Sequence, residues 1–447
     1  MEGLIMAAQL ILGLSILVGL HELGHLLTAK LFGMRVEQYY IGFPPKIFGF
    51  RYGETEYNLG MIPLGGFVKI TGMIDESLDT KNLNEEPQPW EFRSKPAWQR
   101  LIVMMGGIIV NVITGIIIFI ILTYKFGDTY IPRDEVLKNG IVAYELGEEI
   151  GLQTGDKIIK VNGEEYVKFS DLTNANVLLT DDAYYTVERN GDMVEVRIPS
   201  DFLDKFSDKD AAGRYIEVRT PFEVGSLLED SNAEKAGLQE GDLIMTVAGE
   251  EIGFFDEIQQ VLAEHKSETV AIQVMRPDQS GSENPVRKPV TLQVDVTEDG
   301  TIGFYPKPQY ELGRTEYTLA EAIPQGTKEA FNIIWVNIRA IGKIFKGEVS
   351  ASKSLSGPIG IAQIFGPTWD WVRFWRITGL LSMILAFMNF LPIPALDGGH
   401  VAFLTYEIVS GRKPSDKFLE GAQKVGMVLL LTLMTFAIFN DIFKVLF

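Results

Sequence analysis

The sequence predicts a multi-pass α-helical membrane protein with soluble domains inserted between its spans. Of its 447 residues, 46% are hydrophobic, yet 59 are acidic and 40 are basic. Four apolar runs approach or reach the length that crosses a bilayer. Residues 128–303 hold 37 acidic and 16 basic side chains, a balance of −21, whereas the rest holds 22 and 24. The acidity therefore belongs to one soluble block, which argues against a nucleic-acid partner there.

The first apolar run predicts a transmembrane helix over residues 1–32. Residues 4–20 carry no charge, and the apolar character continues to Leu31. A cleaved signal peptide is the alternative. It fits poorly, because Glu2 stands where a basic residue is expected and no small-residue cleavage site follows.

A metal-binding motif stands near the end of this run, at His21-Glu22-Leu23-Gly24-His25. Histidines at positions i and i+4 of a helix lie one turn apart on one face. Two neutral imidazoles so placed can bind one Zn²⁺, which leaves Glu22 free to take a proton from water. The alternative is a pair of polar residues near a helix end, but ionisable groups in a membrane-type helix are costly and usually functional.

The next two segments are a polar loop, residues 33–100, and a second span, residues 101–125. The loop contains residues 57–70, an apolar stretch that is too short to span and is broken by Gly and Pro. It predicts a membrane-associated β-hairpin or a re-entrant segment, with a hairpin on the membrane surface as the alternative.

In the second span, Gly107, Asn111 and Gly115 recur every four residues. We favour helix packing for all three, with Asn111 beside the metal as the minor alternative.

The acidic block contains a duplication. Residues 151–165 and 237–251 are identical at ten of fifteen positions. Each copy predicts a Gly-Asp turn, a strand and a Gly turn, and residues 255–265 predict a helix. The string Gly-Leu-x-x-Gly-Asp-x-Ile resembles bacterial PDZ domains, which implies two α+β domains over residues 126–220 and 221–308. Such domains bind a peptide ligand by strand addition, and the alternative is that both are spacers.

The C-terminal part predicts an interfacial segment and two more spans. Residues 319–346 form an amphipathic pattern too charged to span. We expect four segments: amphipathic helices at 309–368, a third span at 369–411, a cytoplasmic loop at 412–424 and a fourth span at 425–447. Pro392 and Pro394 should break the third span, because proline has no N–H to donate. Lys and Arg in the loop at 30–100 and after residue 411 predict that these two loops face the cytoplasm. The acidic block and both termini would then lie on the other side of the membrane.

A zinc site with two histidines needs a third protein ligand, and the sequence offers Asp397 or His400. The chain has no cysteine, so thiolate ligands are excluded. His265 lies in the acidic block, on the other side of the membrane. Asp397 fits the carboxylate role and lies in Leu-Asp-Gly-Gly, after Asn389-Phe-Leu-Pro-Ile-Pro-Ala.

These motifs, in this order, resemble the site-2 protease family of intramembrane metalloproteases, and the inserted repeats resemble its regulator-of-sigma-E branch. The resemblance implies that His21, His25 and Asp397 bind Zn²⁺, that Glu22 is the catalytic acid/base, and that Asn389 contacts substrate or the oxyanion. For Asn389 the alternative is a cap on the broken helix. The loop with Gly65, Gly66, Phe67 and Val68 is expected to bind substrate as an edge strand.

The resemblance implies an endopeptidase of a bacterial inner membrane. Its substrates would be single-pass membrane proteins already trimmed outside the cytoplasm, such as an anti-sigma factor or a signal-peptide remnant. Its partners would be that substrate, the lipid bilayer and a peptide ligand of the PDZ domains. A soluble zinc protease, a non-catalytic membrane scaffold and a transporter are the alternatives. The uncharged run before the motif disfavours a soluble zinc protease. The complete set of catalytic residues disfavours a scaffold, and the lack of an inverted repeat disfavours a transporter.

Overall fold

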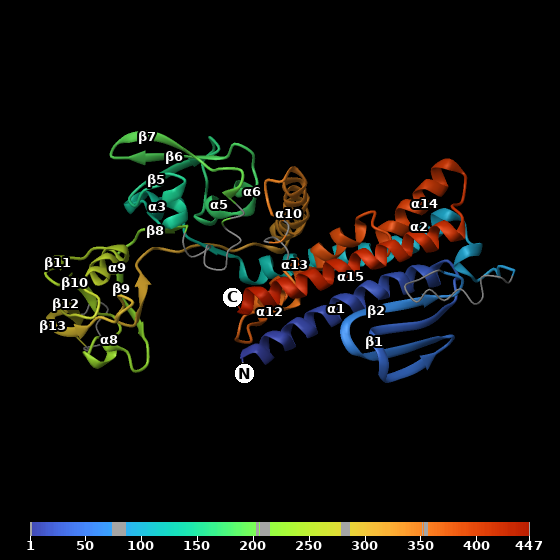
Figure 1. The fold of residues 1–447 in the computed structure, drawn as a ribbon, viewed down its shortest axis with the longest axis horizontal. Coiled ribbons are helices and arrows are strands. Elements are labelled where there is room, and N and C mark those ends of the chain that lie inside the picture. The colour runs from blue at the N-terminus through green and yellow to red at the C-terminus, as the bar shows by residue number, and fades with distance from the viewer. Residues whose placement is uncertain are drawn as a thin grey trace. The chain divides into compact units, whose positions relative to one another are not determined.

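The computed structural model describes residues 2–73, 86–202, 205, 215–278, 287–350, 352 and 356–446. The chain divides into two compact units. The first comprises Met1–Asp128 and Glu316–Phe447, and the second comprises Thr129–Thr315. The ribbon in Figure 1 labels their elements.

Four helices of the first unit are long and apolar enough to cross a membrane, which confirms the predicted number of spans among the described residues. They are α1 (Glu2–Leu31), α2 (Ala97–Phe126), α13 (Trp371–Phe390) and α15 (Asp416–Leu446). The fourth helix begins at Asp416, well before the predicted start at residue 425. Its first turns carry Lys417, Glu420 and Lys424, so charge marked the end of the apolar stretch but not the end of the helix.

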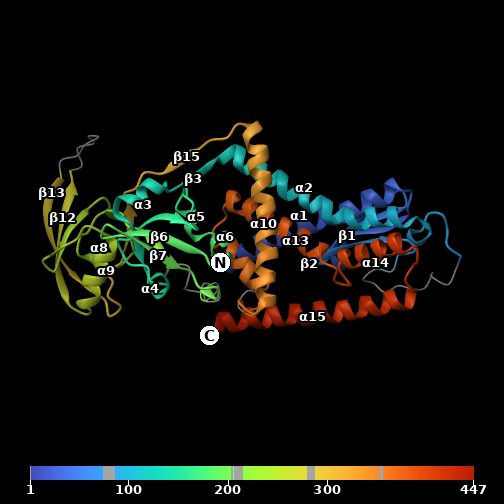
Figure 2. The same ribbon diagram turned by 90° about the horizontal axis from the view of Figure 1, so that it is seen from above.

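Helix α2 is the centre of this unit. It packs against α1, α13, α14 (Asp397–Ser410) and α10 (Leu319–Lys346). Figures 1 and 2 together show α10 crossing the long helices at a steep angle. Helix α10 has the predicted bounds, and it starts with a capping box in which Thr318 and Glu321 satisfy each other's backbone N–H groups. The Glu321 carboxylate accepts hydrogen bonds from the N–H and the hydroxyl of Thr318, and these two bonds lower its pKa.

The third span is broken where the prolines predict. Helix α13 ends at Phe390, and α14 starts at Asp397. Pro392 and Pro394 lie in the break, and Ala395 adopts a left-handed φ of 77°. The break leaves Asp397 in the first turn of α14. The helix dipole favours a carboxylate at that position.

Strands β1 (Val36–Tyr52) and β2 (Thr55–Ile70) form a sheet that packs on α1. Segment 36–41 of β1 pairs with residues 66–70 on one side and with residues 56–59 on the other. The predicted hairpin within residues 57–70 is therefore wrong, because the two halves of β2 are separated by β1. The tight turn lies instead at Gly53, where φ is +61°. Segment 66–70 forms the edge nearest the predicted metal ligands.

The short helix α12 (Pro358–Phe365) packs against α1, α13 and α15. Its first turn is capped by Asp441 of α15, a side chain only 3% exposed. The Asp441 carboxylate accepts backbone N–H bonds from Gly357, Ile359 and Gly360, each at 2.9 Å. One carboxylate thus joins the end of the last apolar helix to the start of α12.

The second unit contains the two repeats, and each has a hydrophobic core of its own. The elements of repeat 1 are α3 (Arg133–Asn139), β4 (Ile141–Ala143), α4 (Glu145–Glu149), β5 (Lys157–Val161), α5 (Ser170–Thr173), α6 (Ala175–Leu178), β6 (Tyr184–Arg189), β7 (Asp192–Arg197) and β8 (Ile216–Val218). Those of repeat 2 are β9 (Phe222–Leu227), α8 (Asn232–Lys235), β10 (Leu243–Val247), β11 (Glu250–Glu251), α9 (Phe255–Glu264), β12 (Thr269–Pro277), β13 (Arg287–Asp295) and β14 (Phe304–Pro308). Strand β15 (Gly313–Thr315) pairs with β3 (Asp128–Tyr130).

Both repeats contain a hydrogen-bonded aspartate–arginine pair at the same place. Asp156, after the Gly turn of repeat 1, accepts two hydrogen bonds at 2.7 Å from Arg189 at the end of β6. In repeat 2, Asp242 accepts bonds from Arg276 of β12 at 2.9 and 2.7 Å. Each arginine also donates to the backbone oxygen of the Gly that opens the repeated string. The predicted Gly-Asp turn and following strand are present in both copies.

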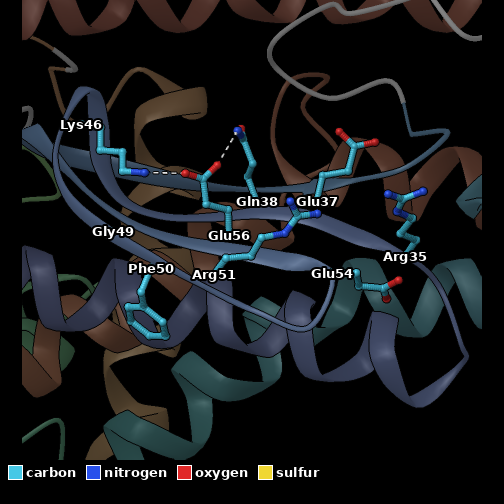
Figure 3. A pocket seen from close by; sticks show the side chains of 9 residues that line it. All are labelled: Arg35, Glu37, Gln38, Lys46, Gly49, Phe50, Arg51, Glu54 and Glu56. Atoms are coloured by element: carbon cyan, nitrogen blue, oxygen red, sulfur yellow. Dashed lines mark hydrogen bonds and ion pairs between the residues drawn. The ribbon is translucent and has the colours of Figure 1, made fainter.

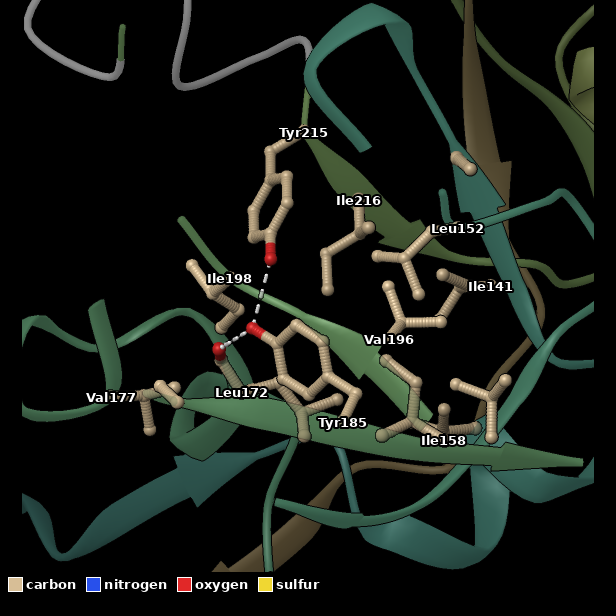
Figure 4. Packing of buried hydrophobic residues seen from close by; sticks show 14 of the residues in the cluster. Ile141, Leu152, Ile158, Leu172, Val177, Tyr185, Val196, Ile198, Tyr215 and Ile216 are labelled. Carbon is tan, nitrogen blue, oxygen red and sulfur yellow. Dashed lines mark hydrogen bonds between the residues drawn. The ribbon is translucent and has the colours of Figure 1, made fainter. Parts of the chain in front are cut away.

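The core of repeat 1 contains two buried phenols in one hydrogen-bonded chain (Figure 4). The Tyr215 hydroxyl donates to the Tyr185 hydroxyl at 2.9 Å, and Tyr185 donates to the backbone oxygen of Leu172 at 2.5 Å. Burial raises the pKa of both phenols, because the phenolate would have to lose its hydration.

Candidate metal centre

Helix α1 presents His21 and His25 on one face, one turn apart. Their side chains are 9% and 7% exposed, and the two Nε2 atoms lie 3.3 Å apart. The Nδ1 atom of His25 lies 2.8 Å from the backbone oxygen of Val103. A carbonyl can only accept, so Nδ1 carries the proton and Nε2 keeps its lone pair for a ligand.

The third predicted ligand, Asp397, reaches the same point from the start of α14. Its Oδ2 atom lies 3.1 Å from Nε2 of His21 and 3.3 Å from Nε2 of His25. Atoms bound about 2.0–2.1 Å from a tetrahedral Zn²⁺ are separated by roughly 3.3–3.4 Å. The triangle of 3.1, 3.3 and 3.3 Å therefore fits this coordination with almost no adjustment.

The donor set also fits zinc chemically. Two imidazole nitrogens and one carboxylate oxygen leave a fourth position open, as in catalytic zinc sites. The Oδ2 atom of Asp397 is buried and faces the two Nε2 atoms. Since a buried carboxylate oxygen is expensive unless paired, a cation between the three side chains would satisfy it.

Glu22 stands between the two histidines in the sequence and faces the edge of the sheet. The backbone of Val68 hydrogen-bonds to its carboxyl group. A Cβ atom on Gly66 would lie 3.3 Å from Cγ of Glu22 and 2.5 Å from the backbone oxygen of Tyr40. Only glycine fits between the sheet and α1 at this position.

A cavity of about 580 Å³ opens onto this group. It is lined by the three predicted ligands and by Glu22, Asn389, Gly65, Gly66, Phe67 and Val68. All the site residues predicted from the sequence therefore lie around one cavity. Phe43, Leu385, His400 and Gln423 also line it.

Asn389, in the last turn of α13, points at the same centre. Its Nδ2 atom lies 3.4 Å from Nε2 of His21. The side chain therefore lies beside the atoms that would bind a metal.

The expectation of helix packing holds for Gly107, against α1, and for Gly115, and it is corrected for Asn111 alone. The Nδ2 atom of Asn111 lies 3.1 Å from Nδ1 of His21. A Cβ on Gly107 would come within 2.5 Å of Nε2 of His25 and 2.6 Å of Cε1 of His21. Gly115 does pack, against Met383 of α13. A four-residue spacing puts these residues on one face but does not say which helix that face meets.

One further residue of the site was not predicted. Gln423 of α15 is only 4% exposed and lines the cavity, although the sequence places it next to Lys424 in a charged stretch. His400, which the sequence offered as an alternative ligand, lines the cavity but is not in the ligand triangle.

A second hollow, of about 550 Å³, lies on the β1–β2 sheet and has a different chemistry (Figure 3). It is lined mainly by charged side chains, and Lys46 lies 2.5 Å from Glu56 and lowers the pKa of that carboxyl group. Glu56 also accepts a hydrogen bond from Gln38. None of the predicted site residues lines this hollow.

Comparison with known proteins agrees with the geometry. The profile of peptidase family M50 matches residues 9–433. A Pasteurella multocida protein that bears the name of a zinc metalloprotease is 30% identical over 98% of both chains. The regulator of sigma E protease of Haemophilus influenzae is 29% identical over 97% of this chain and 98% of its own. The regulator of sigma-E protease RseP of Escherichia coli K12 is 28% identical over 97% of both. The chain therefore belongs to peptidase family M50, the site-2 protease family, and is a zinc metalloprotease.

Proposed function

We propose that the chain is an intramembrane endopeptidase in which His21, His25 and Asp397 hold the zinc and Glu22 is the catalytic acid/base. One observation carries this proposal. Three ligand atoms at mutual distances of 3.1–3.3 Å lie beside the carboxylate of the same motif, on a helix long and apolar enough to span a membrane. Peptide-bond hydrolysis is the chemistry that this set of groups supplies.

Glu22 would carry the proton through the reaction. When bound, the zinc polarises the scissile carbonyl and makes water a better nucleophile at neutral pH. The Glu22 carboxylate takes the proton of the attacking water and then gives it to the nitrogen of the leaving amine. The hydrogen bond from the backbone of Val68 holds the carboxylate in place for both transfers.

Asn389 would stabilise the charge that develops on the carbonyl oxygen. Its Nδ2 donor lies 3.4 Å from Nε2 of His21, and the side chain lines the cavity in which substrate would lie. A preorganised donor at such a position contributes most in a site that excludes water. Asn389→Ala should lower kcat more than it raises KM, and a change in KM alone would argue for a capping role.

The substrate backbone must be extended before it can be cut, because a membrane-spanning helix uses its carbonyl groups in its own hydrogen bonds. Segment 66–70 is paired with β1 on one side and borders the cavity on the other. Gly65, Gly66, Phe67 and Val68 would bind the unwound substrate by strand addition. Ile70→Pro disrupts that edge and leaves in place the Val68 N–H that bonds to Glu22. A higher KM for a single-span substrate is expected, and an unchanged KM would rule out strand addition.

The names of two relatives and the four apolar helices support the proposed substrate class. Those relatives bear the name regulator of sigma E protease. We infer single-pass membrane proteins already trimmed outside the cytoplasm, such as an anti-sigma factor or a signal-peptide remnant. The enzyme would lie in a bacterial inner membrane, with the PDZ-like repeats outside the cytoplasm and the metal centre toward the cytoplasmic side.

The two repeats would act as a filter that excludes bulky outer domains or binds a peptide ligand. Deleting residues 129–315 should allow cleavage of an untrimmed substrate. Unchanged selectivity after this deletion would count against the filter.

The decisive experiment compares wild type with Glu22→Gln on a single-span substrate in liposomes, with zinc measured in both proteins. Glutamine keeps the shape of the side chain but cannot accept a proton. We expect equal zinc content and a loss of cleavage of about 10²–10⁴-fold or more. Equal cleavage by both proteins would overturn the role of Glu22. A wild type without zinc would overturn the ligand set and favour a non-catalytic scaffold.

A further inference from the structure

The two metal-facing histidines make different contacts with their second ring nitrogen. For His25 that contact is the backbone oxygen of Val103, 2.8 Å from Nδ1, which fixes the tautomer with a free Nε2. For His21 the contact is a side chain, the amide of Asn111, 3.1 Å from Nδ1. His21 therefore depends on one residue of a neighbouring helix for its tautomer.

The Asn111 side chain can serve either tautomer. In the structure its Nδ2 faces Nδ1 of His21, so Nδ1 accepts a hydrogen bond and the proton of His21 is on Nε2. Oδ2 of Asp397 lies 3.1 Å from that Nε2. The opposite end of the amide, Oδ1, is buried and makes no hydrogen bond. The two ends of an asparagine amide have nearly the same shape, so a half-turn exchanges donor and acceptor within the same space. With Oδ1 toward His21, Nδ1 must donate and Nε2 becomes free to bind a metal.

The position of Asn111 is held firmly by its surroundings. The residue is completely buried, and the hydroxyl of Ser382 on α13 donates to its backbone oxygen at 2.8 Å. One turn earlier, Gly107 lets α2 lie against both imidazoles. One turn later, Gly115 fits against Met383. Helix α2 thus presents the amide to His21 at a fixed distance.

We infer that Asn111 is a positioning residue for the metal centre: its Oδ1 accepts the Nδ1–H bond of His21 and so holds the tautomer whose Nε2 binds zinc. The inference rests on the proposed ligand set. Partners of this kind fix the ring orientation of a metal-binding histidine and raise its basicity, and their loss typically weakens metal affinity about 10–100-fold.

The test is the rate at which zinc passes from the full-length protein in detergent to a colorimetric chelator, measured in a Glu22→Gln background so that cleavage plays no part. Asn111→Leu keeps the approximate volume and removes the acceptor. We expect it to lose zinc about 10–100-fold faster. Asn111→Asp keeps an acceptor in either orientation and should hold zinc at least as long as the parent protein.

The matched control is Thr378→Val, which removes a buried hydrogen bond to Phe374 within α13 and leaves Asn111 and its partners in place. Its zinc release should match the parent, and melting temperatures of the zinc-free proteins report on folding. If Asn111→Leu releases zinc at the parent rate, or if Asn111→Asp releases it as fast as the leucine variant, the positioning role is wrong. If His21→Ala leaves zinc binding intact, the ligand set itself fails, and the inference fails with it.

Discussion

Gly24 on α1 and Gly106 on α2 meet backbone to backbone. A Cβ atom built on Gly106 would lie 2.6 Å from the carbonyl oxygen of Gly24, and a Cβ on Gly24 would overlap the carbonyl group of Gly106. This contact lies within one turn of His21 and His25, and it sets how near α2 comes to them. Small residues permit such close crossings of membrane helices.

Gly24→Ala should therefore separate α1 from α2 and destabilise the protein by about 1–3 kcal/mol, the usual cost of an overpacked contact. Thermal unfolding in detergent measures this change, and zinc content should fall with it because Asn111 retreats from His21. Gly421→Ala on α15 is the control, since a Cβ there meets nothing within 4 Å. Equal melting temperatures for the two variants would show that the crossing tolerates a methyl group.

Asp441→Ala should loosen α12 from the last apolar helix. Three backbone N–H groups lose their acceptor, and hydrogen bonds to a charged group are worth about 1.5–3 kcal/mol each. Hydrogen exchange of the amides of Gly357, Ile359 and Gly360 should accelerate. Asn440→Ala, which removes an exposed hydrogen bond one residue away, should leave those amides protected. Continued protection in the Asp441 variant would mean that another group caps α12.

Arg276→Met should destabilise repeat 2 while leaving the core of repeat 1 unchanged. Asp242 is fully buried and would lose both of its hydrogen bonds from the arginine. Leaving a buried charge unpaired costs about 3–5 kcal/mol, less here because the arginine is 22% exposed. Limited proteolysis of the full chain, with the cut sites mapped, should show cleavage in 215–278.

Arg189→Met is the matched variant, because it removes the corresponding hydrogen bonds to Asp156 in repeat 1. Its new cut sites should fall in 133–202. Cuts spread equally over both repeats in either variant would show that the repeats unfold together.

Repeat 1 should lose stability at alkaline pH through its two buried phenols. Burial raises the pKa of Tyr185 and Tyr215, so the folded repeat keeps protons that the unfolded chain releases near pH 10. The unfolded state then binds fewer protons, and the free energy of unfolding falls as pH rises above about 10. This contribution is fully present below that pH.

Tyr215→Phe should make the fall with pH less steep, although it loses the hydrogen bond to Tyr185 at neutral pH. Urea unfolding followed by hydrogen exchange of β6, at pH 8 and pH 11, measures both effects. Tyr305→Phe in repeat 2 is the control, because that side chain is 57% exposed. An unchanged pH dependence in the Tyr215 variant would show that its phenol does not control alkaline unfolding.

Much of the membrane unit could be read from the sequence because its signals are local. An uncharged run indicates a long apolar helix, and histidines four residues apart indicate a shared helix face. Pro392 and Pro394 predicted the break that puts Asp397 at a helix N-terminus. The prediction of a hairpin within residues 57–70 failed because β pairing is not local: β1 lies between the two halves of β2.

By itself, the sequence predicted the four apolar helices, the duplication and the residues that could bind a metal, since residue type and spacing carry that information. Only the tertiary structure decided which faces meet. Asn111 contacts His21 from 90 positions away, and Asp441 accepts the N–H bond of Gly357 from 84 positions away. Such contacts depend on helix crossing and rotation, which close backbone approaches such as Gly24–Gly106 set and which no local pattern records.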